Sequence, residues 1–154
     1  MLAGIARRGK ELAMQIREVM SRDVKVASPD DTIQKAADLM DDTDCGALPV
    51  AEGDRLVGII TDRDITLRAV AKGKAPNQCK VREVMSPKIK YIFEDEGTES
   101  ASQNMSRLQV RRLPVLNRQK RLVGIVALGD LATKHDGPAA ATALRGISRT
   151  NATT

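Results

Sequence analysis

Hydrophobic and polar residues alternate over residues 24–72 in a pattern that predicts a strand, a helix, two strands and a second helix. Four apolar residues recur at helical spacing, namely Ile33, Ala36, Ala37 and Met40. Directly before them, Ser28–Thr32 supplies turn residues and a possible N-cap. We therefore expect a helix that begins near Ile33 and closes before Gly46.

Apolar runs on both sides of this helix predict strands. Val24–Val26 alternates as a short strand does, and Ala47–Ala51 and Leu56–Thr61 are longer apolar runs. The turn residues of Glu52–Arg55 predict that the two longer strands form a hairpin. A second helix is expected over Asp62–Lys72, where the next residue is a glycine that would stop it.

The second half of the chain repeats the first. Ile16–Ser21 reads IREVMS, and Val81–Ser86, 65 residues later, reads VREVMS. Leu48–Val50 matches Leu113–Val115 at the same offset, and one residue inserted in the second turn moves the next match to an offset of 66. That next match pairs Arg55–Ile59 with Arg121–Ile125. The chain therefore contains an internal duplication.

The duplication predicts an α+β fold of two pseudo-symmetric units. In the second unit the expected order is a strand Ile89–Phe93, a helix Thr98–Leu108, strands Arg112–Leu116 and Leu122–Ala127, and a helix Gly129–His135. The predicted ranges are an N-terminal extension 1–15, a first unit 16–73, a linker 74–80, a second unit 81–136 and a C-terminal tail 137–154. In the two end segments Leu12–Val19 is compatible with a helix, and we expect the last few residues to be mobile.

The element order and two phrases, GALPV at Gly46–Val50 and LVGIITDRDI at Leu56–Ile65, resemble the CBS domain. A paired copy resembles a Bateman module, in which two CBS domains pack together and leave two clefts for adenosine-containing ligands. The resemblance covers roughly Gln15–His135. It implies a stand-alone regulatory protein that senses a nucleotide and modulates a partner protein.

In that family a Gly-x-x-Thr/Ser-x-x-Asp pattern ends the third strand and opens the last helix, and here it is Gly58, Thr61 and Asp64. The resemblance implies that Asp64 holds the ribose hydroxyls and Thr61 a phosphate. A carboxylate can accept hydrogen bonds from both hydroxyls of a vicinal diol. The alternative is a capping box, because a threonine followed three residues later by an acidic residue can close a helix end without any ligand.

The second copy of the pattern has lost a hydroxyl. Gly124, Ala127 and Asp130 replace the three residues of the first copy, so the carboxylate remains and the threonine is gone. We therefore expect the second cleft to be the weaker one.

The resemblance also implies main-chain and small apolar contacts to adenine, although each apolar residue could equally be core packing. The implied first cleft comprises Ala27, Ser28, Gly46, Ala47, Leu48, Ile60, Thr61, Asp64 and Arg112. The implied second, weaker cleft comprises Ile92, Phe93, Arg112, Leu113, Val126, Ala127 and Asp130. Arg112 is assigned to both because a basic residue at this place can reach a phosphate held in the pseudo-symmetric cleft.

Composition and charge narrow the function classes. The 154 residues carry a net charge of +5, and only 1% of them are aromatic, so stacking of nucleic-acid bases has little support. Five basic residues form the densest basic stretch, namely Arg111, Arg112, Arg118, Lys120 and Arg121. An adaptor that uses this basic face, for nucleic acid or protein, is the alternative function, and a nucleic-acid partner is the less favoured of the two.

The sequence holds no recognisable catalytic or metal-binding constellation. His135 is the single histidine, Cys45 and Cys79 are isolated and expected to be free thiols, and no phosphate loop of the Gly-rich Lys-Ser/Thr type is present. We expect a protein that is not an enzyme, requires no cofactor and holds no metal. No apolar run has the length of a signal peptide or a membrane span, so we expect a cytoplasmic protein without a membrane partner.

The resemblance ranks the ligands and suggests an assembly. AMP, ADP or ATP come first, and NAD(H) or S-adenosylmethionine rank behind them. We expect a homodimer, because CBS pairs commonly associate through their helices and closed two-fold symmetry is the commonest oligomeric outcome. The effector protein is unknown.

Overall fold

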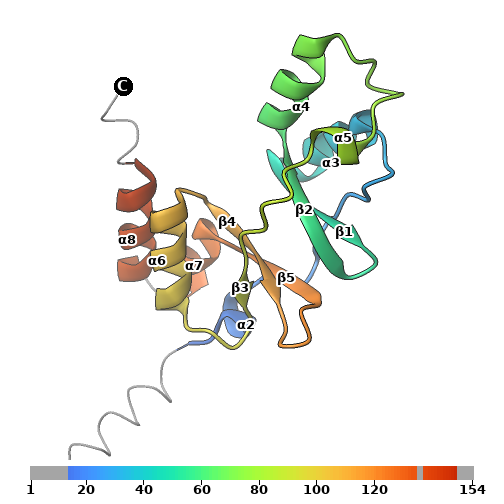
Figure 1. Ribbon diagram of the computed structural model, residues 1–154. Coiled ribbons are helices and arrows are strands. Elements are labelled where there is room, and N and C mark those ends of the chain that lie inside the picture. Colours follow the sequence, from blue (N-terminus) through green and yellow to red (C-terminus); the bar gives the residue numbers. More distant parts are fainter. Residues whose placement is uncertain (1–13, 135–136, 149–154) are drawn as a thin grey trace, which may run out of the picture. The chain divides into compact units, whose positions relative to one another are not determined.

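The computed structural model of the chain describes residues 14–134 and 137–148 (Figure 1). These residues form two compact units that combine sheet and helix, as an α+β fold predicts. The first, which we call the α3–α4 unit, consists of Val24–Lys90 and Lys120–Leu122. The second, the α6–α7 unit, consists of the described residues of 14–23, Tyr91–Gln119, 123–134 and 137–148.

The α3–α4 unit is built on an antiparallel hairpin. Strand β1 (Ala47–Glu52) pairs with β2 (Arg55–Thr61), and Ala47 lies opposite Thr61. Helix α3 (Ile33–Thr43) precedes the hairpin, and α4 (Asp62–Arg68) follows it directly. The side-chain hydroxyl of Thr32 caps α3 by accepting a hydrogen bond from the Lys35 N–H group at 3.2 Å. The predicted order of helix, strand, strand and helix is thus confirmed.

The predicted strand Val24–Val26 is wrong. Only the next residue, Ala27, forms a bridge, which is parallel to Val50 in β1. The Ala27 N–H group donates to the Pro49 oxygen at 3.0 Å, and the Ala27 oxygen accepts from Ala51 at 2.9 Å. The pairing stops there because the chain turns at once, with the Asp31 N–H group donating to the Ser28 oxygen at 3.0 Å.

The predicted second helix Asp62–Lys72 is split. After α4 the chain passes through Ala69 into a short 3-10 helix, η1 (Val70–Lys72), and Gly73 follows with a φ of 71°. The Gly73 N–H group donates to Val70 and that of Lys74 to Ala69, at 3.1 and 3.0 Å. A tightened last turn of this kind satisfies carbonyl groups that a helix end would otherwise leave unpaired.

The α6–α7 unit has a three-stranded sheet. Strand β3 (Ile92–Phe93) is parallel to β4 (Arg112–Leu116), which also neighbours β5 (Leu122–Ala127). The helices are α6 (Thr98–Leu108) and α7 (Leu128–Lys134). The bounds of α6, β4 and β5 are those that the repeat predicts. The first strand is shorter than the expected Ile89–Phe93, and the expected helix end at His135 lies outside the described residues.

The opening hexapeptide of each repeat packs on the unit formed by the other repeat. Helix α2 (Ile16–Val19) belongs to the α6–α7 unit, and α5 (Val81–Val84) belongs to the α3–α4 unit. The Ile16 N–H group donates to Glu96, and the Val81 N–H group donates to Asp31, both at 2.8 Å. The compact units therefore differ from the sequence repeats in these two segments, and also in Lys120–Leu122 of the second repeat, which belongs to the α3–α4 unit.

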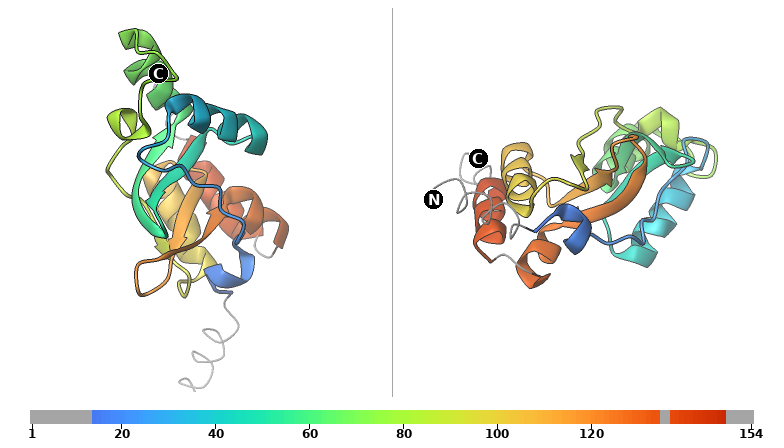
Figure 2. Two further views of the ribbon diagram at one scale, coloured as in Figure 1. Left: turned by 90° about the vertical axis from the view of Figure 1, so that its right-hand side faces the viewer. Right: turned by 90° about the horizontal axis from the view of Figure 1, so that it is seen from below.

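A further helix, α8 (Gly137–Ser148), extends the α6–α7 unit beyond the repeat. It packs on α6 and α7, and the views of Figures 1 and 2 show it beside α6. Ala143 is fully buried, and a Cβ atom on Gly146 would lie 2.6 Å from the Ser106 Cα atom. Glycine is therefore required for this close approach of the two helices. The expected mobility of the last residues concerns residues outside those described.

Each unit has its own aliphatic core. Ile33, Val50 and Ile60 are buried in the α3–α4 unit, and Ile92 and Leu113 are buried in the α6–α7 unit. Among the described residues, no helix combines the length and the apolar character needed to cross a membrane.

Candidate functional site

The first candidate site lies where β2 passes into α4. Thr61 is the N-cap of α4, and its hydroxyl oxygen accepts a hydrogen bond from the Asp64 N–H group at 3.0 Å. In return, Oδ2 of Asp64 accepts from the Thr61 N–H group at 2.9 Å. The two residues therefore form the capping box that their spacing allows.

The capping box leaves the Asp64 carboxylate with unused capacity. A carboxylate has about four acceptor positions on its two oxygens, and the helix cap uses one of them. The Asp64 side chain is 15% exposed, and its Oδ1 lies 3.7 Å from the Arg68 guanidinium. Asp64 is thus held in place by the backbone and can still accept further hydrogen bonds.

Arg68 connects this carboxylate to the end of α5. Its Nη1 donates to the Val84 oxygen at 2.9 Å and lies 3.4 Å from the Met85 oxygen. Sequence reasoning missed this residue, although an arginine four positions after an aspartate on a helix is a recognised pair.

Gly46 has no side chain, which leaves room for the carboxylate of Asp62. The Asp62 N–H group donates to the Gly46 oxygen at 2.9 Å, and a Cβ atom on Gly46 would lie 2.9 Å from Asp62 Oδ2. Ala47 and Leu48 follow on β1, opposite Thr61 and Ile60. The structure therefore brings Gly46, Ala47, Leu48, Ile60, Thr61 and Asp64 together at one end of the hairpin.

Three of the apolar residues assigned to the first site direct their side chains into the core. Ala27, Leu48 and Ile60 are at most 2% exposed and belong to one buried cluster. Their side chains are core residues, as the alternative interpretation had it. Any contact that these residues make with a ligand would therefore come from the main chain. Ser28 starts the adjoining turn, and its N–H group donates to Asp31 Oδ2 at 2.9 Å.

The second candidate site has the same backbone and one bond fewer. The Ala127 N–H group donates to Asp130 Oδ2 at 2.8 Å, which matches the bond between Thr61 and Asp64. Because Ala127 carries no hydroxyl group, the reciprocal bond of a capping box cannot form. Ile92, Leu113 and Val126 are fully buried in the core.

Arg118 makes a cation–π contact with the ring of Phe93. The Arg118 guanidinium carbon lies 4.1 Å from the centroid of the Phe93 ring, and Tyr91 meets the same ring edge to face at 5.4 Å. Arg118 is held there by two hydrogen bonds of 2.8 Å to Asp95. These hydrogen bonds, together with the charge of Arg118, lower the pKa of Asp95 below its usual value. Sequence analysis placed Arg118 only in a basic stretch and missed this contact.

The comparisons with known proteins agree with this geometry. The model of the CBS domain family matches residues 16–70 and 81–136, which is more than half of the chain. The chain belongs to the CBS domain family. The resemblance inferred from the repeat, and with it a tandem CBS pair, is therefore confirmed.

Three similar proteins align with most of this chain. "CBS domain-containing protein YhcV" of Bacillus subtilis is 44% identical over 88% of this chain and 96% of its own length. The solved structure of Hypoxic Response Protein I with two coordinated zinc ions has a TM-score of 0.72 and 35% identity, over 79% of this chain and 99% of that one. A third similar structure is the CBS domain pair of MJ0100 in complex with 5'-methylthioadenosine and S-adenosyl-L-methionine, with a TM-score of 0.66 and 28% identity over 78% and 94% of the two chains.

In this CBS pair, the described residues contain no group of three or more histidine, cysteine, aspartate or glutamate side chains placed to hold a metal ion. Both cysteines are free, Cys45 being partly exposed and Cys79 buried. Burial raises the pKa of the Cys79 thiol.

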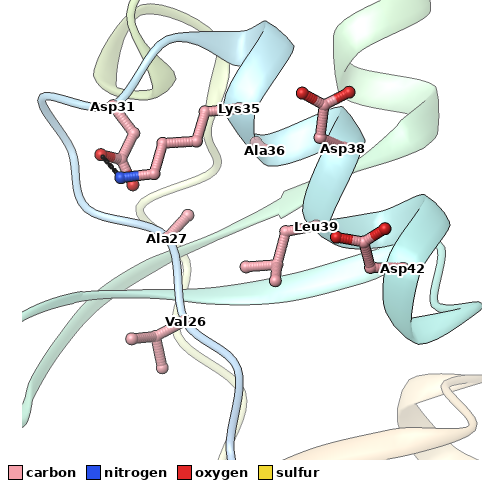
Figure 3. Close-up of a pocket in the computed structure, with 8 residues that line it drawn as sticks. All are labelled: Val26, Ala27, Asp31, Lys35, Ala36, Asp38, Leu39 and Asp42. Atoms are coloured by element: carbon pink, nitrogen blue, oxygen red, sulfur yellow. Dashed lines mark hydrogen bonds and ion pairs between the residues drawn. The ribbon is translucent and has the colours of Figure 1, made fainter.

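A pocket of about 240 Å³ lies between α3 and the segment before it (Figure 3). Three aspartates line it together with Lys35, which pairs with one of them, Asp31, at 3.1 Å. Of the residues predicted for the first CBS site, Ala27 alone lines this pocket. The pocket is therefore distinct from the end of the hairpin where Thr61 and Asp64 lie.

The basic residues of the second CBS repeat are partly neutralised. Arg118 pairs with Asp95, and Arg121 pairs with Asp54. These pairs weaken the adaptor hypothesis, which needs a free basic face. Arg112 begins β4 in the α6–α7 unit, and its assignment to the first site stays a prediction.

Proposed function

We propose that this CBS pair is a regulatory protein that binds an adenosine-containing ligand where β2 meets α4, with Asp64 accepting hydrogen bonds from the ribose hydroxyls. The observation that carries the proposal is the Asp64 carboxylate, which the capping box holds in place while leaving acceptor positions unused. The bound 5'-methylthioadenosine and S-adenosyl-L-methionine of the MJ0100 pair support an adenosine ligand.

The remaining contacts follow from the residues around Asp64. Main-chain groups of Gly46, Ala47 and Leu48 would meet adenine, whose N6 donor and N1 acceptor can pair with a peptide group. The Thr61 hydroxyl would reach a phosphate, and AMP, ADP and ATP therefore remain the first candidates. S-adenosylmethionine and NAD(H) follow.

The second CBS repeat is proposed to bind more weakly. It keeps Asp130 and lacks a hydroxyl at Ala127. The ring of Phe93, which the family resemblance assigns to this site, is covered on one face by Arg118. A base that stacks on this face of Phe93 would have to displace a guanidinium held by two hydrogen bonds to Asp95. That displacement would reduce the affinity of the second site.

The chain is proposed to act as a homodimer that modulates a separate effector protein and catalyses no reaction itself. Relatives that this chain matches over nearly their whole length support a role without an attached effector domain, since the match covers 96% of YhcV and 99% of the Hypoxic Response Protein I chain in the solved structure.

Calorimetry with AMP on three proteins tests the binding site. In Asp64→Asn the amide oxygen of asparagine can still accept from the Thr61 N–H group, but the side chain no longer offers a charged acceptor. Hydrogen bonds to charged groups contribute about 1.5–3 kcal/mol each, so the affinity of the tight phase should fall at least tenfold. The matched variant Asp130→Asn should leave that phase nearly unchanged.

Two outcomes would contradict the proposal. Loss of the tight phase in Asp130→Asn but not in Asp64→Asn would move the main site to the second repeat. If none of AMP, ATP, NAD and S-adenosylmethionine binds the wild-type protein, the ligand proposal fails.

A further inference from the structure

Arg68 joins the Asp64 carboxylate to a segment of the second repeat. Its Nη1 atom donates to the Val84 oxygen at 2.9 Å and lies 3.4 Å from the Met85 oxygen. The same atom lies 3.7 Å from Asp64 Oδ1. One nitrogen atom therefore meets two backbone carbonyl groups and the carboxylate that is proposed to hold the ligand.

The two carbonyl groups belong to the end of a very short helix. Helix α5 has only four residues, and the Met85 N–H group closes it by donating to the Val81 oxygen at 2.9 Å. The last carbonyl groups of a helix have no partner within the helix, and a cation beside them is favourable. How firmly the end of α5 is attached to the unit therefore depends on where the Arg68 guanidinium is held.

Asp64 restricts the position of Arg68. The Arg68 side chain is 52% exposed, so without a partner it would have many rotamers available. Asp64 is itself fixed through its hydrogen bond with the Thr61 N–H group, and an acidic residue four positions before a basic one is the favourable order on a helix. An Arg68 side chain already held beside Asp64 loses less entropy when it donates to the carbonyl groups of α5.

The segment that follows α5 connects this contact to β2 and to the rest of the second repeat. The Ser86 N–H group donates to the Ile59 oxygen at 2.8 Å, and the Ile59 N–H group donates back to Ser86 at 3.0 Å. The chain leaves the α3–α4 unit after Lys90 and enters the α6–α7 unit at Tyr91. Arg68 thus lies between a site of the first repeat and the segment with which the second repeat begins.

We propose that Arg68 is a positioning residue that couples Asp64 to the attachment of α5, so that a ligand held by Asp64 tightens this segment. Ribose hydroxyls that donate to Asp64 displace water from the carboxylate, and the attraction between Asp64 and Arg68 is stronger where water is excluded. Because such coupling is reciprocal, the attachment of α5 also strengthens ligand binding. Only this ligand part of the inference rests on the proposed function.

Hydrogen exchange of the full chain, measured at the Met85 and Ser86 amides, tests the coupling. Without ligand, Arg68→Gln and Asp64→Asn should each lower protection about two- to fivefold, the range expected for a partly exposed ion pair. The double variant should be no less protected than Arg68→Gln alone, because both changes remove the same link. A saturating concentration of AMP should raise protection of these amides in wild type and leave it unchanged in Arg68→Gln.

Calorimetry with AMP provides the reciprocal measurement and its controls. Arg68→Gln should weaken binding about two- to fivefold, which corresponds to the same ion pair. Arg68→Lys should restore much of both effects, because one nitrogen makes all three contacts and the matching residue of the second repeat is a lysine, Lys134. Arg63→Gln removes another exposed arginine of α4 and should change neither AMP affinity nor protection.

The inference is overturned if the effects of Arg68→Gln and Asp64→Asn on protection are additive, or if AMP raises protection in Arg68→Gln as much as in wild type. The second outcome would leave Arg68 with a purely structural role at the end of α5. If wild type binds no adenosine compound while the unliganded variants behave as expected, the ligand proposal fails and the coupling of Asp64 to α5 is upheld.

Discussion

Thr61 and Ala127 occupy equivalent positions with different chemistry. Both precede the last helix of a repeat, and the N–H group of each donates to an aspartate three residues later, at 2.9 and 2.8 Å. Only Thr61 adds the second bond, from the Asp64 N–H group to its hydroxyl. In the absence of a ligand this hydroxyl therefore has a structural role. A phosphate would meet it as an additional partner.

Exchanging the two residues tests the structural role. Thr61→Ala should lower the free energy of unfolding by about 0.5–2 kcal/mol, the usual cost of losing an N-cap side chain. Ala127→Thr should raise it by a smaller amount, because the backbone there already has the cap geometry. Urea denaturation measures both variants. Equal stability of Thr61→Ala and wild type would show that the capping bond contributes nothing.

At the scale of elements, the motif glycines allow a neighbouring segment to approach closely. A Cβ atom on Gly58 would lie 2.7 Å from the Ser86 oxygen, and one on Gly124 would lie 2.8 Å from the Ser21 oxygen. Ser21 follows α2 and Ser86 follows α5. Each serine forms a bridge with the strand that contains the glycine, Ser86 with Ile59 and Ser21 with Ile125. The glycine of the motif therefore allows the sheet to pack closely, whereas the aspartate accepts a backbone hydrogen bond at the start of the following helix.

Alanine substitutions separate this close contact from the general effect of removing a glycine. Gly58→Ala should destabilise the protein by about 1–3 kcal/mol, because the added methyl group meets backbone that has to move. Gly129→Ala, within α7 and with nothing near its Cβ position, should instead stabilise it by up to about 1 kcal/mol. Thermal unfolding compares the two. A Gly58→Ala variant as stable as wild type would refute the steric explanation.

At the scale of the whole molecule, each repeat contributes a short helix to the core of the other repeat's unit. Ile16 and Val19 are at most 1% exposed and lie in the cluster of Ile92 and Leu113. Val81 and Val84 are fully buried in the cluster of Ile33 and Ile60. Neither unit therefore has a complete core without residues from both repeats.

Truncation of one exchanged side chain should destabilise the unit on which it packs. Ile16→Ala should cost about 2–5 kcal/mol and lower hydrogen-exchange protection mainly in α6, β4 and β5. Val81→Ala, the matched variant, should lower protection mainly in α3, β1 and β2. If Ile16→Ala instead lowered hydrogen-exchange protection mainly in β1 and β2, the assignment of α2 to the core of the α6–α7 unit would be wrong.

The sequence by itself determined the elements and the spacing of the candidate site. The predicted bounds of α6, β4 and β5 agree with the structure. The spacing of apolar residues in a helix or strand indicates which of its sides is buried, and this depends on the local sequence alone. The interval between Thr61 and Asp64 offered a capping box as the alternative to a ligand site, and the structure contains its two hydrogen bonds. Comparing the two copies also identified Ala127 as the position with the missing hydroxyl.

The tertiary structure alone decided which distant segments meet. The predicted strand Val24–Val26 is replaced by a single bridge at Ala27, because the turn that follows leads the chain away from β1. The alternation of apolar residues in the sequence does not show where that turn begins. The exchange of α2 and α5 could not be predicted, because Ile16 and Val81 have the same local pattern and would fit either core equally well. Arg118 reaches Phe93 across 25 positions of sequence. Periodicity records the burial of a residue, whereas the identity of its partner depends on how the complete chain is connected in space.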